Sequence, residues 1–159
     1  MDSRQVALML ELALFSGYTR AGVEGLIAPG EVRTYPAGEQ LCKEGDPADG
    51  VVVILRGRLR VYIERRGAER VMSEFGPGTI LGEVAVLCGT PRAASVRALE
   101  ASDVLFWTDK AFRSLLLRDV HLSQRIFSVT MHALIEREKA LLETLASAPP
   151  FIVEKTAAQ

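Results

Sequence analysis

Residues 81–96 read Leu81-Gly82-Glu83-Val84-Ala85-Val86-Leu87-Cys88-Gly89-Thr90-Pro91-Arg92-Ala93-Ala94-Ser95-Val96. Gly82 allows close backbone approach, and residues 83–87 can form one helical turn whose free N–H groups favour an anion. Arg92, nine positions after Glu83, presents a planar fork of donors suited to a phosphate. Glu83 offers acceptor oxygens for a ribose hydroxyl. This segment therefore outlines a site for a nucleotide monophosphate.

Short runs of β-forming residues, separated by Gly and Pro, surround this segment. The pattern predicts strands at residues 32–35, 40–43, 51–55, 59–64, 70–75, 94–99 and 104–108. Many short strands at such regular spacing are typical of a β-sandwich or β-barrel.

Helical patterns flank the predicted strands on both sides. Apolar spacing predicts helices at residues 4–15, 19–27, 109–117 and 122–146. Pro149-Pro150 ends the last helix, and residues 147–159 are expected to form a tail. The predicted layout is therefore helix, β-barrel and long C-terminal helix.

The composition limits the class of protein. The chain has 159 residues, 48% hydrophobic and 25% charged, with a net charge of −1, which fits one globular domain and gives no bulk attraction for nucleic acid or a membrane surface. Cys42 and Cys88 are far apart, and His121 and His132 lie outside the predicted strands. We therefore expect a cytoplasmic protein with free thiols, no metal site and no membrane segment.

The segment at 81–96 resembles the phosphate-binding cassette of the cyclic nucleotide-binding domain family. That pattern is Gly-Glu-x-Ala, two apolar residues, three variable ones and Pro-Arg-Ala-Ala-(Thr/Ser)-Val, and every specified position matches here. Three further stretches resemble the family's strand and turn signatures: Pro36-Ala37-Gly38-Glu39, Glu44-Gly45-Asp46-Pro47-Ala48-Asp49 and Arg56-Gly57-Arg58-Leu59-Arg60-Val61.

Over about residues 10–146, the chain resembles the sensor half of catabolite-activator-type proteins, and cyclic-AMP-dependent kinase regulatory subunits have a similar cassette. The resemblance implies an α+β fold: an antiparallel β-barrel of the jelly-roll, cupin-like type with N-terminal helices and a long C-terminal helix.

The resemblance also implies roles for the matched residues. Arg92 would pair with the cyclic phosphate, and Glu83 would accept a hydrogen bond from the ribose 2′-hydroxyl. Backbone N–H groups at Ala85 and Ala93 would hold phosphate oxygens. The expected ligand-binding residues are Gly82, Glu83, Val84, Ala85, Arg92, Ala93, Ala94 and Ser95, with Leu81 and Glu138 as additional candidates.

Ala93 bears on which cyclic nucleotide binds. Family members that prefer cyclic GMP often have Thr at this place, with a hydroxyl that reaches the guanine amino group, and Ala lacks it. We therefore expect cyclic AMP rather than cyclic GMP as the regulatory ligand. An alternative for Glu83 and Arg92 is a buried ion pair that holds the cassette closed, which is compatible with exchange for ligand.

The helix predicted at 122–146 carries two apolar stripes. One repeats about every 3.5 residues, as in a two-stranded coiled coil: Phe127, Met131, Leu134, Glu138, Leu141 and Leu145. The other is expected to pack on the barrel: Leu122, Ile126, Val129 and Ala133. The first stripe, named the seam below, predicts a homodimer, with packing inside one chain as the alternative.

Glu138 is the polar member of the seam. In catabolite-activator-type proteins, a polar pair near this point caps the adenine, and Arg137-Glu138 stands there in this chain. Glu138 is therefore a candidate acceptor for the adenine amino group, with a solvated edge of the seam as the alternative.

A run of arginines marks one predicted strand. Arg56, Arg58 and Arg60 alternate along it, so their side chains share a face. They either bind an anionic partner or form the solvated outer face of a hairpin.

These observations predict a cyclic nucleotide sensor in which ligand draws the C-terminal helix against the barrel. The sequence shows no nucleophile–base constellation or Walker loop, so we do not expect an enzyme. The sensor domain is expected at residues 1–146, with the barrel at about 30–108 and the C-terminal helices at 109–146.

Three settings for such a sensor remain open. It could be a stand-alone signalling protein with an unknown protein partner, the sensing fragment of a transcription regulator, or a regulatory domain of a channel, transporter or enzyme. Met1 and the N-terminal helix favour a complete chain. Only thirteen residues follow Ala146, so we expect no helix-turn-helix and no DNA binding by this chain alone.

Overall fold

The computed structural model describes residues 3–147. The chain divides into two compact units, Met1–Ile126 and Phe127–Gln159. The boundary falls inside helix α5 (Val120–Ser147), so the first turns of this helix belong to the first unit. The tail predicted at residues 147–159 lies, apart from Ser147, outside the described residues.

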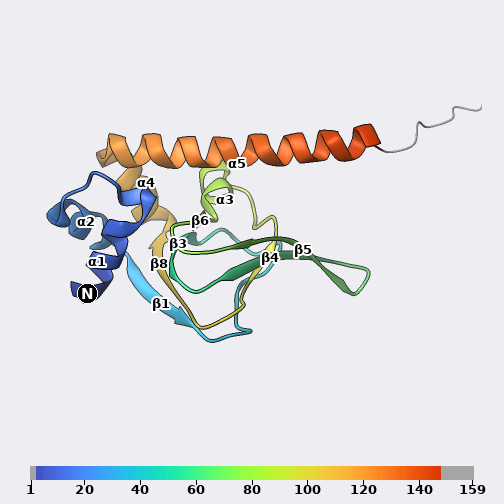
Figure 1. The fold of residues 1–159 in the computed structure, drawn as a ribbon, viewed down its shortest axis with the longest axis horizontal. Coiled ribbons are helices and arrows are strands. Elements are labelled where there is room, and N and C mark those ends of the chain that lie inside the picture. The colour runs from blue at the N-terminus through green and yellow to red at the C-terminus, as the bar shows by residue number, and fades with distance from the viewer. Residues whose placement is uncertain (1–2, 148–159) are drawn as a thin grey trace, which may run out of the picture. The chain divides into compact units, whose positions relative to one another are not determined.

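The first unit combines short helices with two β-sheets (Figure 1). Its helical segments are α1 (Ser3–Glu11), η1 (Ala13–Phe15), α2 (Arg20–Ile27), α3 (Glu83–Cys88), α4 (Asp109–Arg118) and the start of α5. Its strands are β1 (Glu31–Tyr35), β2 (Gln40–Cys42), β3 (Gly50–Arg56), β4 (Leu59–Arg65), β5 (Ala68–Phe75), β6 (Ile80–Leu81), β7 (Ser95–Ala98) and β8 (Ser102–Thr108).

The strands form two sheets and not the closed barrel predicted from the sequence. One sheet has the order β1-β8-β3-β6 and the other β2-β7-β4-β5, all with antiparallel pairing. Except between β4 and β5, the chain changes sheet after every strand, and no described strand pair joins the two sheets. The prediction of mixed helix and sheet is therefore correct, and the prediction of a closed barrel is wrong. Gly and Pro residues indicate where a strand ends, but they do not indicate which strand it pairs with.

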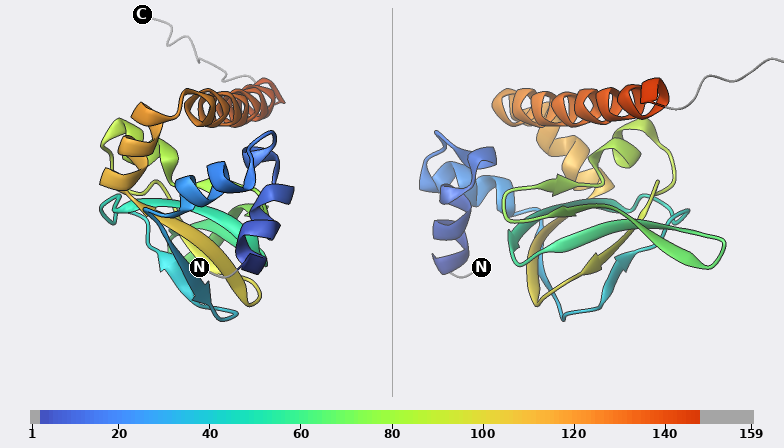
Figure 2. Two further views of the ribbon diagram at one scale, coloured as in Figure 1. Left: turned by 90° about the vertical axis from the view of Figure 1, so that its left-hand side faces the viewer. Right: turned by 45° about the vertical axis from the view of Figure 1, so that its right-hand side comes forward.

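Strand β3 lies between the two hydrophobic clusters of the first unit and is therefore buried on both faces. Val51, Val53 and Leu55 join a hydrophobic cluster with the N-terminal helices and α4, whereas Ile54 packs with Leu59 of the other sheet. Alternate residues of a strand point to opposite faces, so this apolar run serves two cores. The first sheet therefore lies between the helices and the second sheet, with α1 and α2 at one end (Figure 2).

Two elements differ from the expectation. The helix predicted at 4–15 is interrupted at Leu12, whose extended backbone separates α1 from η1. Strand β6 was not predicted, because two residues are too few for any periodicity to be visible.

The two apolar stripes of α5 have different environments. Leu122 and Ile126 are buried in the first unit, as predicted, but Val129 is 50% exposed. The apolar residues of the seam are all between 38% and 70% exposed: Phe127, Met131, Leu134, Leu141 and Leu145. No helix within residues 3–147 is both long and apolar enough to cross a membrane.

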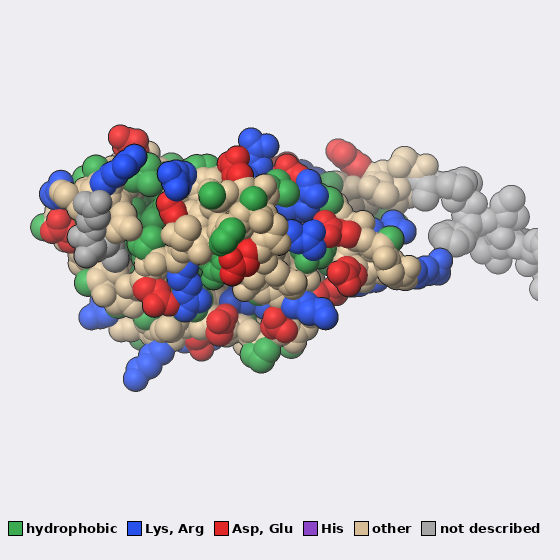
Figure 3. Space-filling model, turned by 90° about the horizontal axis from the view of Figure 1, so that it is seen from below, with side chains coloured by type: hydrophobic (Ala, Val, Ile, Leu, Met, Phe, Trp, Pro, Cys, Tyr) green, Lys and Arg blue, Asp and Glu red, His purple; other side chains and the backbone are tan. Residues whose placement is uncertain are grey.

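The arginines on and near β4 are mostly paired with carboxylates. Arg60 donates to Glu74 at 2.7 Å, and Arg56 lies 3.2 Å from Asp103. Basic and acidic side chains are interspersed on the face in Figure 3, which favours a solvated surface over a binding site for an anionic polymer.

The junction between α4 and α5 is fastened to the N-terminal segment. The Tyr18 hydroxyl donates to Asp119 Oδ1 at 2.6 Å, and the same oxygen accepts the N–H of Leu122 at 2.8 Å. Arg125 donates to the carbonyl of Leu14 at 3.1 Å. Burial and the hydrogen bond to Asp119 raise the pKa of Tyr18 to about 12. The neutral phenol is therefore the form that stabilises this junction.

We predict that Tyr18→Phe lowers the free energy of unfolding by about 1 kcal/mol at pH 8, because one hydrogen bond is lost. In the parent chain, the contribution of Tyr18 is complete below the unfolded pKa of about 10 and is lost as the pH rises towards 12. Urea unfolding of both proteins at several pH values between about 8 and 12 tests this. The difference in stability should narrow at high pH, and a constant difference would contradict the assignment.

Candidate functional site

The predicted cassette begins where β6 meets α3. Gly82 precedes the helix with φ of 90°, in the left-handed region that favours glycine. The first helical hydrogen bond runs from Val86 N–H to the carbonyl of Gly82 at 3.2 Å, so the earlier N–H groups of α3 have no acceptor within the helix. The local structure thus provides the turn of helix predicted at residues 83–87.

Gly82 also leaves room for Arg92. A Cβ atom at Gly82 would lie 2.3 Å from Arg92 Nη1 and 3.2 Å from the carbonyl oxygen of Gly50. Any larger residue at this position would therefore displace the guanidinium group. Position 82 is glycine for two reasons, the positive φ and the contact with Arg92.

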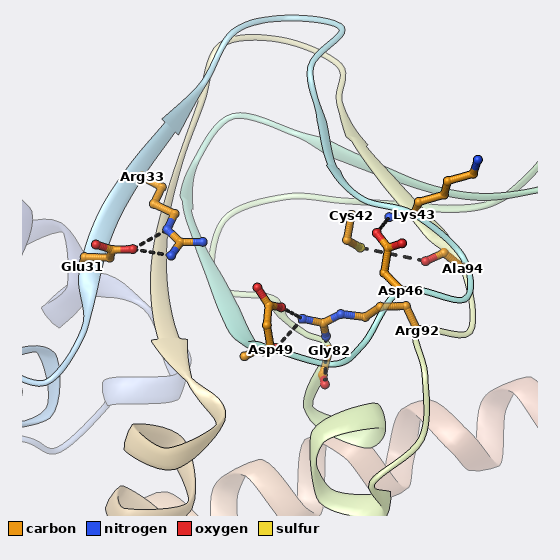
Figure 4. A network of polar contacts seen from close by, with 10 residues as sticks. Glu31, Arg33, Cys42, Lys43, Asp46, Asp49, Gly82, Arg92 and Ala94 are labelled. Carbon is orange, nitrogen blue, oxygen red and sulfur yellow. Dashed lines mark hydrogen bonds and ion pairs between the residues drawn. The ribbon is translucent and has the colours of Figure 1, made fainter.

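Arg92 reaches into the first unit and is held from several sides (Figure 4). Nη2 donates to the carbonyl of Gly50 at 2.6 Å and to Asp49 Oδ1 at 2.7 Å, and Nη1 donates to the carbonyl of Gly82 at 3.4 Å. The side chain is only 10% exposed. Its ion-pair partner Asp49 was not singled out from the sequence, although it ends one of the stretches that carried the family resemblance.

The backbone around Arg92 is fixed by the loop between β2 and β3. Arg92 N–H donates to the carbonyl of Asp46 at 2.8 Å, and Gly45 N–H donates to the carbonyl of Arg92 at 2.9 Å. Glu44 N–H donates to Ser95 Oγ at 2.9 Å. The Ser95 hydroxyl, predicted as a ligand contact, therefore already supports this loop, while its proton remains available for donation.

The donors of Arg92 are not all used. Among the described residues, its Nε is a buried side-chain nitrogen without a hydrogen-bond partner. An unpaired buried donor on a charged group is costly, so an acceptor at this position would be stabilising. The chemistry of this position, a cationic donor beside the first turn of α3, suits an anion.

The other predicted site residues lie along the same segment. Glu83 and Ala85 are buried on α3, Val84 is half-buried, and Ala93 is exposed just after Arg92. Leu81, in β6, packs against the cluster between the sheets. Glu138 is exposed on the part of α5 that belongs to the second unit, so its contact with ligand stays a prediction.

The cassette helix is linked directly to α4. Arg113 of α4 donates to the carbonyl of Val86 in α3, and its Nε donates to Asp109 at 2.5 Å. Sequence reasoning missed this link because Arg113 and Val86 are far apart in the chain. Within residues 3–147, no group of three or more His, Cys, Asp or Glu side chains is arranged to hold a metal ion.

Comparison with known proteins points in one direction. Residues 32–119 match the family model described as "Cyclic nucleotide-binding domain". Over 85 residues, the chain is 40% identical to the cAMP-dependent protein kinase type II regulatory subunit of Drosophila melanogaster, covering 53% of this chain and 22% of that protein. The chain thus spans less than a quarter of the length of this curated relative.

Solved structures give the same result. The catabolite activator protein of Thermus thermophilus is similar with a TM-score of 0.75 and 25% identity, covering 84% of this chain and 62% of that one. The regulatory domain of Toxoplasma gondii PKA, solved with cAMP, is similar with a TM-score of 0.62 and 26% identity, covering 72% of this chain and 45% of that one.

We predict that Gly82→Ala moves the Arg92 side chain, whereas Gly38→Ala does not. Both glycines have positive φ, so each alanine should cost about 1–3 kcal/mol of stability through backbone strain. Only at Gly82 does the new methyl group meet Arg92, since a methyl group at Gly38 would have no atom within 4 Å. The Arg92 Nε resonance in ¹H–¹⁵N NMR spectra should shift in Gly82→Ala alone. Equal shifts in both variants would contradict the packing described here.

Proposed function

The chain belongs to the cyclic nucleotide-binding domain family, and we propose that within this family it is a sensor for cyclic AMP. The chain is a cyclic nucleotide-binding regulatory domain of the type found in catabolite activator proteins and kinase regulatory subunits.

One observation carries the proposal: the buried Nε of Arg92, which lacks a hydrogen-bond partner among the described residues. A cyclic phosphate supplies the missing acceptor and a negative charge to balance the guanidinium. The first turn of α3 supplies backbone N–H groups on the other side of the phosphate. The proposed ligand-binding residues are Gly82, Glu83, Val84, Ala85, Arg92, Ala93, Ala94 and Ser95, with Leu81 and Glu138 as additional contacts.

Glu83 and Ala93 give the proposed site its selectivity. Glu83, buried at the start of α3, accepts from the ribose 2′-hydroxyl. Ala93 has no hydroxyl to offer a guanine amino group, which supports cyclic AMP over cyclic GMP. The similarity to a regulatory domain solved with cAMP supports the same choice.

The contacts of the first unit suggest how occupancy reaches α5. Arg113 joins the carbonyl of Val86 in α3 to α4, and α4 leads to the junction fastened by Tyr18 and Asp119. A shift of α3 on binding ligand changes the hydrogen bond of Arg113 and so biases the position of α4 and the start of α5. We propose that this bias on α5 is the output of the sensor.

The seam on α5 supports a homodimer. Its five apolar residues are exposed and recur at coiled-coil spacing, so a second copy of the chain can cover them. The described cysteines, Cys42 and Cys88, are free, which supports a reducing cytoplasm. We propose that the dimer acts on a protein partner and not directly on DNA or a membrane, and that it catalyses no reaction.

We predict that Arg92→Leu weakens the binding of cyclic AMP about 10- to 100-fold, since a charge-assisted pair with phosphate is lost. Isothermal titration calorimetry measures the affinity. Arg56→Leu is the matched control, because Arg56 has the same charge and its partner is Asp103, outside the cassette. Unchanged affinity in Arg92→Leu would disprove the phosphate assignment.

A thermal-shift panel of cyclic AMP, cyclic GMP and cyclic dinucleotides on the parent chain checks the ligand class. Cyclic AMP should raise the melting temperature most, because Ala93 gives guanine no additional contact. The absence of a shift with every compound would overturn the proposed function.

We predict that the parent chain sediments as a dimer at high micromolar concentration and that Leu141→Glu sediments as a monomer. A glutamate at position 141 would place one charge from each chain in the apolar contact between the two helices. Ala140→Glu is the matched control, because Ala140 is exposed and lies beside the seam and not in it. A monomeric parent chain, or equal dissociation of both variants, would contradict the dimer.

A further inference from the structure

We propose that Cys42 is a covalent modification site inside the cassette, at which a small disulfide that carries a carboxylate forms a mixed disulfide and excludes the cyclic nucleotide. This inference deepens the function proposed above and rests on it. Bound nucleotide, in return, shields the sulfur. Oxidising conditions thereby make the chain insensitive to its ligand, and a reducing thiol restores the response.

The pairing of β2 determines where the side chain of Cys42 points. Cys42 is the last residue of β2 and lies opposite Val96 of β7. Residues directly opposite each other in an antiparallel pair share a face, and Val96 packs against the cluster between the two sheets. The Cys42 side chain therefore lies on the inner face of its sheet, towards the other sheet.

The Cys42 thiol lies beside the arginine of the cassette (Figure 4). Its Sγ is 4.0 Å from the carbonyl oxygen of Ala94, two residues after Arg92. Arg92 crosses the space between the sheets to donate to the carbonyl of Gly50 in β3, and its charge acts on the thiol. A nucleotide bound as proposed, by Arg92, Ala93 and Ala94, therefore covers the sulfur.

The free donor of Arg92 selects the chemistry of the modifying group. The Arg92 side chain is 10% exposed, and its Nε has no hydrogen-bond partner among the described residues. A carboxylate on a group attached to Cys42 supplies this donor with an acceptor and a negative charge. The same carboxylate takes the position proposed for the phosphate, so the adduct and the nucleotide exclude each other.

The reaction is a thiol–disulfide exchange. The Cys42 thiolate attacks one sulfur of the small disulfide, a new S–S bond forms, and the other half leaves as a thiolate that takes up the proton lost by Cys42. Burial raises the pKa of the Cys42 thiol; the charge of Arg92 lowers this pKa, and the charges of Asp46 and Asp49 raise it. The thiolate fraction is therefore small at neutral pH and increases as the pH rises.

The test treats the Cys88→Ser chain, in which Cys42 is the remaining cysteine, with dithiodiglycolate, a small disulfide with two carboxylates, at about pH 8.5. We expect the mixed disulfide to weaken the binding of cyclic AMP roughly tenfold or more in calorimetric titration, and dithiothreitol to restore it. Cys42→Ser is the matched control. Its affinity should be the same before and after treatment, since only Cys88, exposed at the end of α3, can react.

A second measurement uses the parent chain and follows both thiols by mass spectrometry of their peptides. Saturating cyclic AMP should slow the modification of Cys42 roughly tenfold or more and leave that of Cys88 unchanged. Cystamine, a small disulfide of opposite charge, should modify Cys42 roughly three- to tenfold more slowly than dithiodiglycolate, when each rate is divided by the rate at Cys88.

The outcomes separate this inference from the proposed function. If the reduced chain binds cyclic AMP, three results overturn the exclusion and leave the proposed function standing: no reaction at Cys42, unchanged binding after Cys42 is modified, or equal modification with and without cyclic AMP. Equal relative rates with cystamine and dithiodiglycolate overturn the role of the carboxylate. No binding by the reduced parent chain overturns both the inference and the proposed function.

Discussion

The buried guanidinium of Arg92 is the interaction on which the site depends. A cation with a side chain that is 10% exposed needs partners, and they come from two separate parts of the chain: Asp49 and Gly50 at the start of β3, and Gly82 at the start of α3. The first two partners are fixed by β3, and the third lies between β6 and α3. The core around β3 and the geometry of the cassette are therefore coupled, since moving β3 would move the carbonyl that holds Arg92.

The sequence predicts the local structure around Gly82 and Arg92 well, whereas the ligand contacts of these residues stay a prediction. Gly82, Glu83 and Arg92 fall within one short segment, so their spacing alone places a helix start near a guanidinium. Asp49 could not be found in this way, because it precedes Arg92 by 43 positions and meets it only through the folding of β3 against β6. Arg113 was missed because it lies 27 positions from Val86 and because its partner there is a backbone carbonyl, which no side-chain pattern reveals.

The fold shows the same division between local and distant information. Most strands lie within a residue or two of their predicted bounds, because Gly and Pro restrict the backbone at each strand end. The assignment of strands to two sheets depends on pairing between distant segments, such as β1 with β8, and the sequence pattern does not encode it directly. On α5, periodicity predicted the apolar stripes, but it could not tell that Leu122 is buried and Val129 is half exposed.

The hairpin of β4 and β5 extends past the other strands of the first unit, and its turn consists of Arg66 and Gly67, both with positive φ (Figure 1). Open turns of this kind, remote from any core, are the places where proteins accept inserted domains. The two cores and the cassette lie in other segments, so a fluorescent protein fused into this turn would leave their contacts in place. The hairpin thus offers an attachment point for a label that leaves the cassette and both cores undisturbed.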